Sequence, residues 1–201
     1  ISGIRGTIGG KSGDVLSPVD AVKFTSAYGM WLIKRNEEKG GVGKLKVVIG
    51  RDARISGEMV RNLVIGSLQG LGIDVIDIGL STTPTVEIAV PLEQAQGGII
   101  LTASHNPKQW NALKLLNEKG EFISATDGSE VLRIAETEEF NFADVDSLGK
   151  CYFNSDYISI HINQILALPQ IDTDAIKKAN FKIAIDCVNS TGGIFIPELL
   201  K

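Results

Sequence analysis

Three short apolar segments, separated by stretches with helical periodicity, constrain the fold of this chain more than any other feature. They are "LKVVIG" (45–50), "IDVIDIG" (73–79) and "GGIIL" (97–101). Each has the length and the apolar content of a buried strand. The connections between them are short, and a crossover helix is the compact way to join parallel neighbours. The pattern therefore predicts an α/β domain with a mainly parallel sheet.

The helices between these strands are indicated by their ends and their periodicity. Ser17 and Pro18 stand where an N-cap and a first helical residue are expected, and Asp20 follows in the first turn. This helix should extend to about Arg35. Apolar residues at three-to-four spacing predict a second helix that stops at Gly72.

Later segments complete the first domain. Short helices are expected over 83–90 and 127–138, whereas "NALKLLNEKGEFIS" (111–124) is a hairpin signal that would add an antiparallel edge. The acidic segment 136–146 predicts a solvated connector. Together these elements predict a three-layer α/β/α domain with a mixed, mainly parallel sheet.

We expect the chain to divide into a first domain at 1–152 and a second part at 153–201. In the second part, "DYISIHINQILAL" and "DTDAIKKAN" are typical of helices, and "FKIAIDC" (181–187) is typical of a buried strand before the turn "VNSTGGIF". These elements predict the beginning of a second α/β domain. The sequence starts without methionine and ends just after an apolar stretch, so we expect both ends to be cuts in a longer chain.

Charge and cysteine content limit the partners. The 201 residues have a net charge of −4 and no long run of Lys or Arg, which argues against nucleic acid or an anionic membrane as the main partner. No apolar run approaches the ~18 residues that a membrane span needs. Cys151 and Cys187 lie far apart and lack metal-ligand spacing, so a reducing, cytoplasmic setting is expected.

The segment "TASHNP" (102–107) raises the question of a serine nucleophile. Ser104 lies three residues past Leu101, at a strand end where open α/β sheets place their ligand crevice. A hydrolase triad is disfavoured, because His105 is adjacent in sequence and no G-x-S-x-G elbow is present. Phosphoryl chemistry instead needs a hydroxyl that carries phosphate, nearby cations and usually Mg²⁺.

Candidate cations stand at three places. Lys114 lies in the apolar run "NALKLL", where it either reaches for an anion or covers apolar surface with its stem while its head meets water. Arg5 lies between glycines that either admit a ligand closely or make a flexible terminus. In "GRDARIS", Arg51 and Arg54 face the crevice, or Asp52 ties Arg51 into a structural pair, and we expect the pair.

The motifs "SGIRG", "GRDARIS", "TASHNP", an N-x-x-K that ends at Lys114, and "IDCVNSTGG" occur in this order and resemble those of the α-D-phosphohexomutases. That family includes phosphoglucomutase/phosphomannomutase and phosphoglucosamine mutase. The resemblance covers nearly the whole chain, and T-A-S-H-N-P is highly specific. It implies that Ser104 is the phosphoserine of the resting enzyme and exchanges its phosphoryl group with a hexose 1- or 6-phosphate through a bound 1,6-bisphosphate.

The resemblance also implies roles around Ser104. Lys114 matches a lysine that is a candidate for proton transfer, Arg5 matches an arginine near the same centre, and His105 would help surround the phosphate. Which of these acts as acid or base stays open, because electrostatic stabilisation explains cations equally well. Mg²⁺ would bind through the phosphate on Ser104 and three aspartates of a D-G-D-x-D-R loop. That loop has no match here, and Ala112 stands where many relatives have glycine.

We therefore expect the amino-terminal part of a phosphohexomutase of the glucose or mannose type, inactive by itself. Its expected partners are a phosphorylated hexose and the remaining domains of the same polypeptide. Two alternatives remain: a phosphoglucosamine mutase, and a non-catalytic sugar-phosphate-binding module that would keep the serine loop without turnover.

Overall fold

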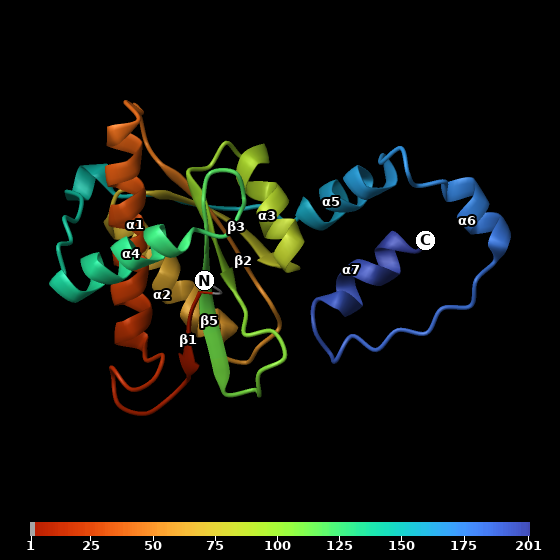
Figure 1. The fold of residues 1–201 in the computed structure, drawn as a ribbon, viewed down its shortest axis with the longest axis horizontal. Coiled ribbons are helices and arrows are strands. Elements are labelled where there is room, and N and C mark those ends of the chain that lie inside the picture. Colours follow the sequence, from red (N-terminus) through yellow and green to blue (C-terminus); the bar gives the residue numbers. More distant parts are fainter. Residues whose placement is uncertain (1–2) are drawn as a thin grey trace.

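The computed structural model describes residues 3–201 and contains a six-stranded sheet in the order β1-β5-β4-β2-β3-β6 (Figure 1). The strands are β1 (Ile4–Thr7), β2 (Lys46–Arg51), β3 (Asp74–Leu80), β4 (Gly97–Leu101), β5 (Trp110–Leu116) and β6 (Cys151–Phe153). β2 pairs in parallel with β3 and β4, and β3 pairs in parallel with β6, whereas β5 is antiparallel to both β4 and β1. The sheet is therefore mixed and mainly parallel, as predicted.

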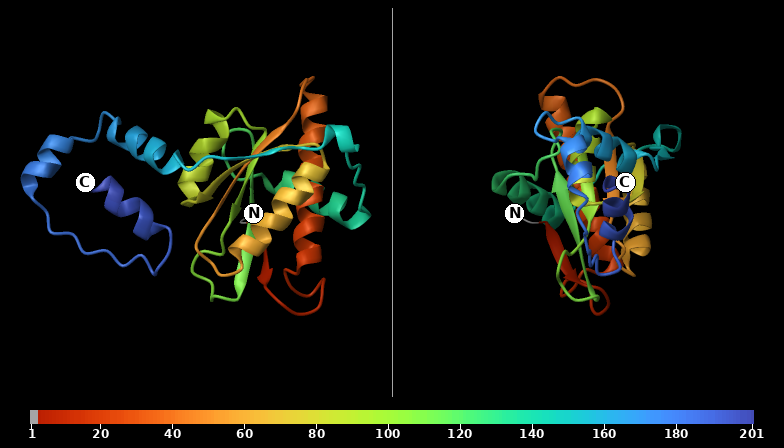
Figure 2. Two further views of the ribbon diagram at one scale, coloured as in Figure 1. Left: turned by 180° about the vertical axis from the view of Figure 1, so that it is seen from behind. Right: turned by 90° about the vertical axis from the view of Figure 1, so that its right-hand side faces the viewer.

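Helices cover both faces of the sheet and make it the middle of three layers (Figure 2). The helices are α1 (Pro18–Glu38), α2 (Gly57–Gly70), α3 (Thr83–Leu92), α4 (Ala125–Thr137), α5 (Tyr157–Leu166), α6 (Thr173–Ala179) and α7 (Gly192–Leu199), with a 3-10 turn at Val145–Ser147. α1, α2 and α4 cover one face of the sheet and α3 covers the other, whereas α6 and α7 lie away from it (Figure 1). Val47 and Ile49 of β2 enter the core under α1, α2 and α4, whereas Val48 enters the core under α3. Successive residues of one strand thus fill opposite cores. Within residues 3–201, no helix is long and apolar enough to cross a membrane.

The start of α1 confirms its sequence signals. The Ser17 hydroxyl accepts a hydrogen bond from the backbone N–H of Asp20 at 3.3 Å, and the Asp20 carboxylate accepts one from the backbone N–H of Ser17 at 3.0 Å. This reciprocal pair satisfies two amides that have no partner inside the helix. The helix continues to Glu38, slightly beyond the predicted end.

The predicted hairpin is only partly correct. Its first half is β5, but β5 lies inside the sheet, and its second half makes a single bridge between Leu116 and Phe122. The antiparallel edge is instead β1. From the sequence, the glycines around Arg5 were expected either to admit a ligand closely or to make a flexible terminus. Gly3, just before β1, lies so near β5 that a Cβ atom there would be 2.5 Å from the Leu113 carbonyl oxygen. Glycine here permits a close approach of two strands, although the same residue type is typical of loops.

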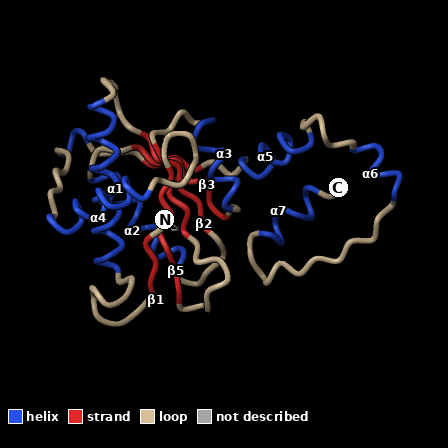
Figure 3. The backbone as a smooth tube through the Cα atoms, viewed as in Figure 1, coloured by secondary structure: helices blue, strands red, loops and turns tan. Residues whose placement is uncertain are grey.

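The predicted strand at 181–187 is wrong. This segment is an extended loop between α6 and α7 (Figure 3). Phe181, Ile183 and Ile185 are 68%, 56% and 47% exposed. A strand needs a neighbour that takes up its backbone hydrogen bonds, and within residues 3–201 no strand pairs with this segment. Its apolar composition alone therefore does not make a sheet.

The remainder of the second part contains the predicted helices. α5 and α6 occupy the two predicted helical segments, and α7 begins directly after the 188–191 turn. β6 adds residues 151–153 to the first sheet, and α5 packs against α3, where His161 Nδ1 lies 3.0 Å from Thr85 Oγ1. The division of the chain into 1–152 and 153–201 stays a prediction.

The turn after β5 is tied to the end of α1 by charge, which gives a prediction for stability. Glu118 accepts a hydrogen bond from Lys39 and lies 3.5 Å from Nη2 of Arg35. Burial alone would raise the pKa of Glu118, but the hydrogen bond and the two cations outweigh it and lower the pKa from 4.5 to about 2. We expect Glu118→Gln to lower the free energy of unfolding by about 1 kcal/mol near neutral pH, a small effect because solvent reaches the pair.

The sign of the pH dependence follows from the lowered pKa. The folded state holds Glu118 ionised to lower pH than the unfolded state does, so the stabilisation is complete above the unfolded pKa and is lost as the pH falls towards 2. Urea unfolding between about pH 7 and about pH 2.5 measures it. Glu37→Gln, in the same helix end, is the control, because Glu37 is exposed and joins none of the ion pairs found in residues 3–201. An equal loss for Glu118→Gln at both ends of the range would contradict this assignment.

Candidate active site

The loop between β4 and β5 presents the serine of "TASHNP" at the carboxyl edge of the parallel strands. Ser104 and His105 are both exposed in this loop. Ser104 has a φ of 54°, in the left-handed region that residues other than glycine seldom adopt. Such a conformation costs free energy and persists only where the surrounding structure holds it. The contacts of the loop therefore decide where the Ser104 hydroxyl points.

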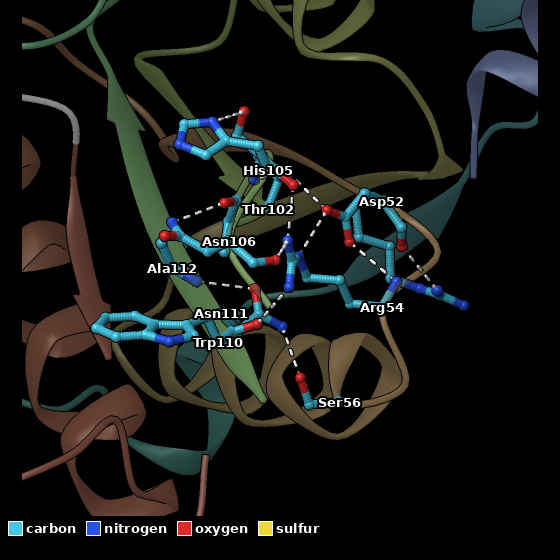
Figure 4. Close-up of polar contacts among 12 residues, drawn as sticks. Asp52, Arg54, Ser56, Thr102, His105, Asn106, Trp110, Asn111 and Ala112 are labelled. Atoms are coloured by element: carbon cyan, nitrogen blue, oxygen red, sulfur yellow. Dashed lines mark hydrogen bonds and ion pairs between the residues drawn. The ribbon is translucent and has the colours of Figure 1, made fainter. Parts of the chain in front are cut away.

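A ring of hydrogen bonds holds the backbone of Ser104, and Figure 4 shows its members Asp52, Arg54 and Thr102. The Ser104 N–H donates to Thr102 Oγ1 at 3.2 Å, and the Thr102 hydroxyl donates to Asp52 Oδ2 at 2.7 Å. Asp52 Oδ2 also accepts from Arg54 Nε at 3.2 Å. Arg54 Nη2 closes the ring by donating to the Ser104 carbonyl oxygen at 2.7 Å. The segment after β2 thus fixes both backbone polar groups of Ser104.

The guanidinium of Arg54 also binds the rest of this loop. Besides the bond to Ser104, it donates to the carbonyl oxygens of Asn106 at 2.8 Å, Pro107 at 2.9 Å and Trp110 at 2.9 Å. One side chain therefore gathers four backbone carbonyl groups from the whole connection between β4 and β5.

The predicted pair between Asp52 and Arg51 is wrong, because Asp52 binds Arg54 instead. The Asp52 carboxylate accepts from the backbone N–H of Arg54 at 3.0 Å, a local turn that brings these two side chains together. The Arg51 guanidinium donates to the carbonyl oxygen of Asp52 at 3.2 Å. The Asp52 carboxylate thus supports the serine loop by binding Arg54 and does not pair with Arg51.

Ser104 and Lys114 line one cavity of about 240 Å³ at this edge of the sheet. The other residues of its wall, mostly hydroxyl-bearing, are Asp52, Ser81, Thr82, Thr83, Ile100, Thr102, Ser190 and Thr191. Thr82 is the N-cap of α3 and Thr191 immediately precedes α7. Two helices therefore begin at this wall, and helix starts carry partial positive charge. A hydroxyl, a lysine and two helix starts together favour an anion.

Lys114 lies on the face of the sheet that α3 covers, opposite Ile100 of β4. Its ammonium nitrogen lies 5.8 Å from the centroid of the Phe122 ring. Burial raises the pKa of Glu87 on α3, and the positive charge of Lys114 offsets part of this rise. The sequence left two interpretations of Lys114 open, a ligand for an anion and a cover for apolar surface. The structure combines them, because the side chain packs against an aromatic ring and also lines the cavity.

Arg5 and His105 differ in their relation to Ser104. Arg5 lies on β1 opposite Ala112 and lines a separate cavity against α1 and α4, whose wall does not include Ser104. His105 Nδ1 lies 3.5 Å from Ser104 Oγ, at the outer limit of a hydrogen bond. A second cavity next to the loop is lined by Ser104, His105 and residues 188–190. His105 therefore lies beside the serine, and Arg5, opposite Ala112, stands on the same face of the sheet as Lys114.

Sequence reasoning missed the start of α3 and the role of Thr102 as parts of this site. A signal for α3 existed, since Thr83-Pro84 marks a helix start directly after a strand, and such starts lie at the ligand edge of α/β sheets. Thr102 had no such signal, because its hydroxyl acts through Asp52, which is distant in sequence.

The described residues do not form a metal centre by themselves. In residues 3–201 there is no group of three or more His, Cys, Asp or Glu side chains that could hold a metal ion. The Asp52 carboxylate in the cavity wall already accepts hydrogen bonds from Thr102 and Arg54.

The fold and the site together define a three-layer α/β/α domain that presents a serine loop beside an anion-favouring cavity. Residues 1–142 match the family model "Phosphoglucomutase/phosphomannomutase, alpha/beta/alpha domain I". The chain therefore belongs to the phosphoglucomutase/phosphomannomutase family, which confirms the resemblance seen in its motifs.

Similar proteins support this assignment. The chain is 33% identical over 198 residues to a phosphoglucomutase/phosphomannomutase of Thermococcus kodakarensis, covering 98% of this chain and 42% of that protein. It is 33% identical over 200 residues to a phosphoglucosamine/phosphogalactosamine mutase of Sulfurisphaera tokodaii, covering 99% and 41%. A solved phosphoglucomutase/phosphomannomutase family structure from Burkholderia thailandensis has the same fold, with a TM-score of 0.66 at 23% identity over 82% of this chain and 34% of that one. The chain thus spans about two fifths of the length of these curated relatives.

Proposed function

We propose that the protein carrying this chain is a phosphohexomutase that interconverts the 1- and 6-phosphates of glucose or mannose through a phosphoserine at Ser104. The observation that carries the proposal is the shared cavity of Ser104 and Lys114, where an exposed hydroxyl stands beside a cation and two helix starts. Family membership supports the same chemistry. A hydrolytic triad fits less well, because in residues 3–201 no carboxylate hydrogen-bonds the ring of His105.

In each proposed half-reaction, one phosphoryl group moves and one proton is exchanged for it. The oxygen of a sugar hydroxyl attacks the phosphorus of phosphoserine, the bond from phosphorus to Ser104 Oγ breaks, and a bond to the sugar oxygen forms. The sugar hydroxyl gives up its proton and Ser104 Oγ gains one, so atoms and charge balance. The resulting 1,6-bisphosphate then returns its other phosphoryl group to Ser104 by the reverse steps.

The neighbours of Ser104 have separate proposed roles. Lys114, which lines the same cavity as Ser104, stabilises the charge of the phosphoryl group and holds or releases the proton. His105 surrounds the phosphate, given its distance of 3.5 Å to Ser104 Oγ. Arg5 keeps its proposed role near the reaction centre on its family motif, and its position opposite Ala112 puts it on the same face of the sheet as Lys114.

We propose Mg²⁺ as a cofactor of the whole protein. A divalent cation would supply positive charge against the transferring phosphoryl group. The phosphate on Ser104 would be one ligand, whereas the Asp52 carboxylate is occupied by Arg54 and Thr102. In residues 3–201 no group of three or more His, Cys, Asp or Glu completes such a site.

A phosphoglucosamine mutase is the second candidate, since relatives with that name match the chain as well as the glucose and mannose type does. The test uses the whole protein. Intact-mass measurement should show one phosphoryl group on the resting protein, and turnover with Mg²⁺ and a bisphosphate primer should be faster with glucose or mannose 1-phosphate than with glucosamine 1-phosphate. Faster turnover of the amino sugar would support the second candidate. A protein with neither covalent phosphate nor turnover would be a binding module.

We propose a phosphorylated hexose and the other domains of the same polypeptide as its partners, with no nucleic acid or membrane partner, in view of the net charge of −4. A cytoplasmic location fits Cys151 and Cys187, which are both free thiols.

A further inference from the structure

We propose that Arg54 is the positioning residue of the serine loop: its guanidinium fixes the backbone from Ser104 to Trp110 so that the Ser104 hydroxyl is held at the cavity. This inference rests on the proposed phosphoryl transfer at Ser104. It assigns to Arg54 a role that acts through the backbone of the loop and involves no contact with the sugar or the phosphate.

Every N–H donor of the Arg54 side chain has a partner inside the protein. A guanidinium has five N–H donors in a rigid, planar fork. Nε donates to Asp52, Nη1 donates to the carbonyl oxygens of Pro107 and Trp110, and Nη2 donates to those of Ser104 and Asn106. These five contacts use all five donors.

This complete set of contacts separates Arg54 from a phosphate-binding arginine. No donor is left for an anion, and the side chain is only 11% exposed. The charge of Arg54 is balanced by Asp52, which lies in the same cluster. Phosphate recognition by arginine depends on free, paired N–H donors, and Arg54 has none.

The same contacts also explain the conformation of the serine. Ser104 has a left-handed φ of 54°, which a serine does not keep without support. Arg54 holds its carbonyl oxygen, and Asp52 holds its N–H through the hydroxyl of Thr102. Carbonyl oxygens that pointed into the cavity would repel a phosphate, so turning four of them towards Arg54 also removes negative charge from the path of the phosphoryl group.

The test compares Arg54→Ala and Arg54→Lys in the whole protein with Arg133→Ala and Arg133→Lys. Arg133 is an exposed arginine on α4, which covers the face of the sheet opposite the one that α3 covers, and it is paired with Glu130. We expect both Arg54 variants to lower kcat by about 100-fold with little change in KM, because a serine displaced by about 1 Å loses about that factor. Lysine should not rescue the function, since one ammonium group cannot reach four carbonyl groups and a carboxylate. The Arg133 variants should keep the activity of the unmodified protein.

Hydrogen exchange supplies a readout that does not depend on activity. Backbone amides over 102–110 should exchange faster in both Arg54 variants, whereas those of β2 and β3 should keep their protection. If Arg54→Ala does not fold, Thr102→Val is the second variant. It removes the Thr102 hydroxyl from the ring of hydrogen bonds at nearly constant volume, so it should speed the exchange of the same amides by a smaller amount. Wild-type kcat in Arg54→Lys, or a rise in KM at constant kcat, would overturn the inference. Absence of phosphate on unmodified Ser104 would refute the proposed function instead, and the exchange data would still decide the role of Arg54.

Discussion

Replacing Ser104 with alanine in the whole protein is expected to abolish the covalent phosphate and to lower mutase turnover by at least about a thousandfold. The reason is chemical, because alanine has no oxygen to which a phosphoryl group can be bonded. The fold should persist, since the Ser104 side chain is exposed and its hydroxyl lies 3.5 Å from His105 Nδ1, at the outer limit of a hydrogen bond. Intact-mass measurement and turnover of hexose 1-phosphate measure the two effects.

A second serine variant controls for effects that any substitution of this kind would have. Ser129 is exposed on α4, on the face of the sheet opposite α3, and its hydroxyl donates to the carbonyl oxygen of Ala125 within the same helix. Ser129→Ala should therefore keep both the phosphate and the turnover. A phosphate adduct that persisted in Ser104→Ala would place the phosphorylation elsewhere and would remove the basis of the proposed mechanism.

The parts of this site that could be predicted from the sequence are those that local pattern determines. The three apolar segments gave β2, β3 and β4 because strands buried on both faces are continuous apolar runs with short connections. Once these strands were placed in parallel, the position of Ser104 just after β4 put it at the ligand edge. That Lys114 lies near Ser104 was implied only by the resemblance of the motifs, because the pattern alone left Lys114 either reaching for an anion or covering apolar surface.

Other features depend on contacts between distant parts of the chain, and no local pattern indicates them. Arg54 binds carbonyl oxygens that lie about fifty residues further along, and backbone carbonyl groups leave no trace in residue types. The segment 181–187 has the composition of a strand, but no neighbour pairs with it in residues 3–201. β1 was missed for the converse reason: its glycines are typical of loops, whereas its pairing with β5 makes it a strand.

Replacing Lys114 with methionine is the second large change that we expect, a fall in kcat of about a hundredfold to a thousandfold in the whole protein. Methionine keeps the apolar stem that packs near Phe122, so the loss should reflect the missing charge and proton and not a defect of packing. Thermal unfolding checks that the stability is kept, and turnover with saturating hexose 1-phosphate measures kcat. Lys34→Met, an exposed lysine on α1 that pairs with Glu130, is the matched control and should keep full activity.

A second substitution at the same position separates the two roles that a lysine has in the cavity it shares with Ser104. Lys114→Arg keeps a permanent positive charge but exchanges protons poorly. If Lys114 acts by charge alone, arginine should restore most of the turnover that methionine removes; if it transfers the proton of the sugar hydroxyl, arginine should be nearly as inactive as methionine. The pH dependence of kcat for the arginine variant distinguishes these cases, since a lost proton donor removes one limb of the profile. Unchanged turnover in Lys114→Met would exclude both roles and would leave Lys114 as a residue that covers the face of the sheet under α3.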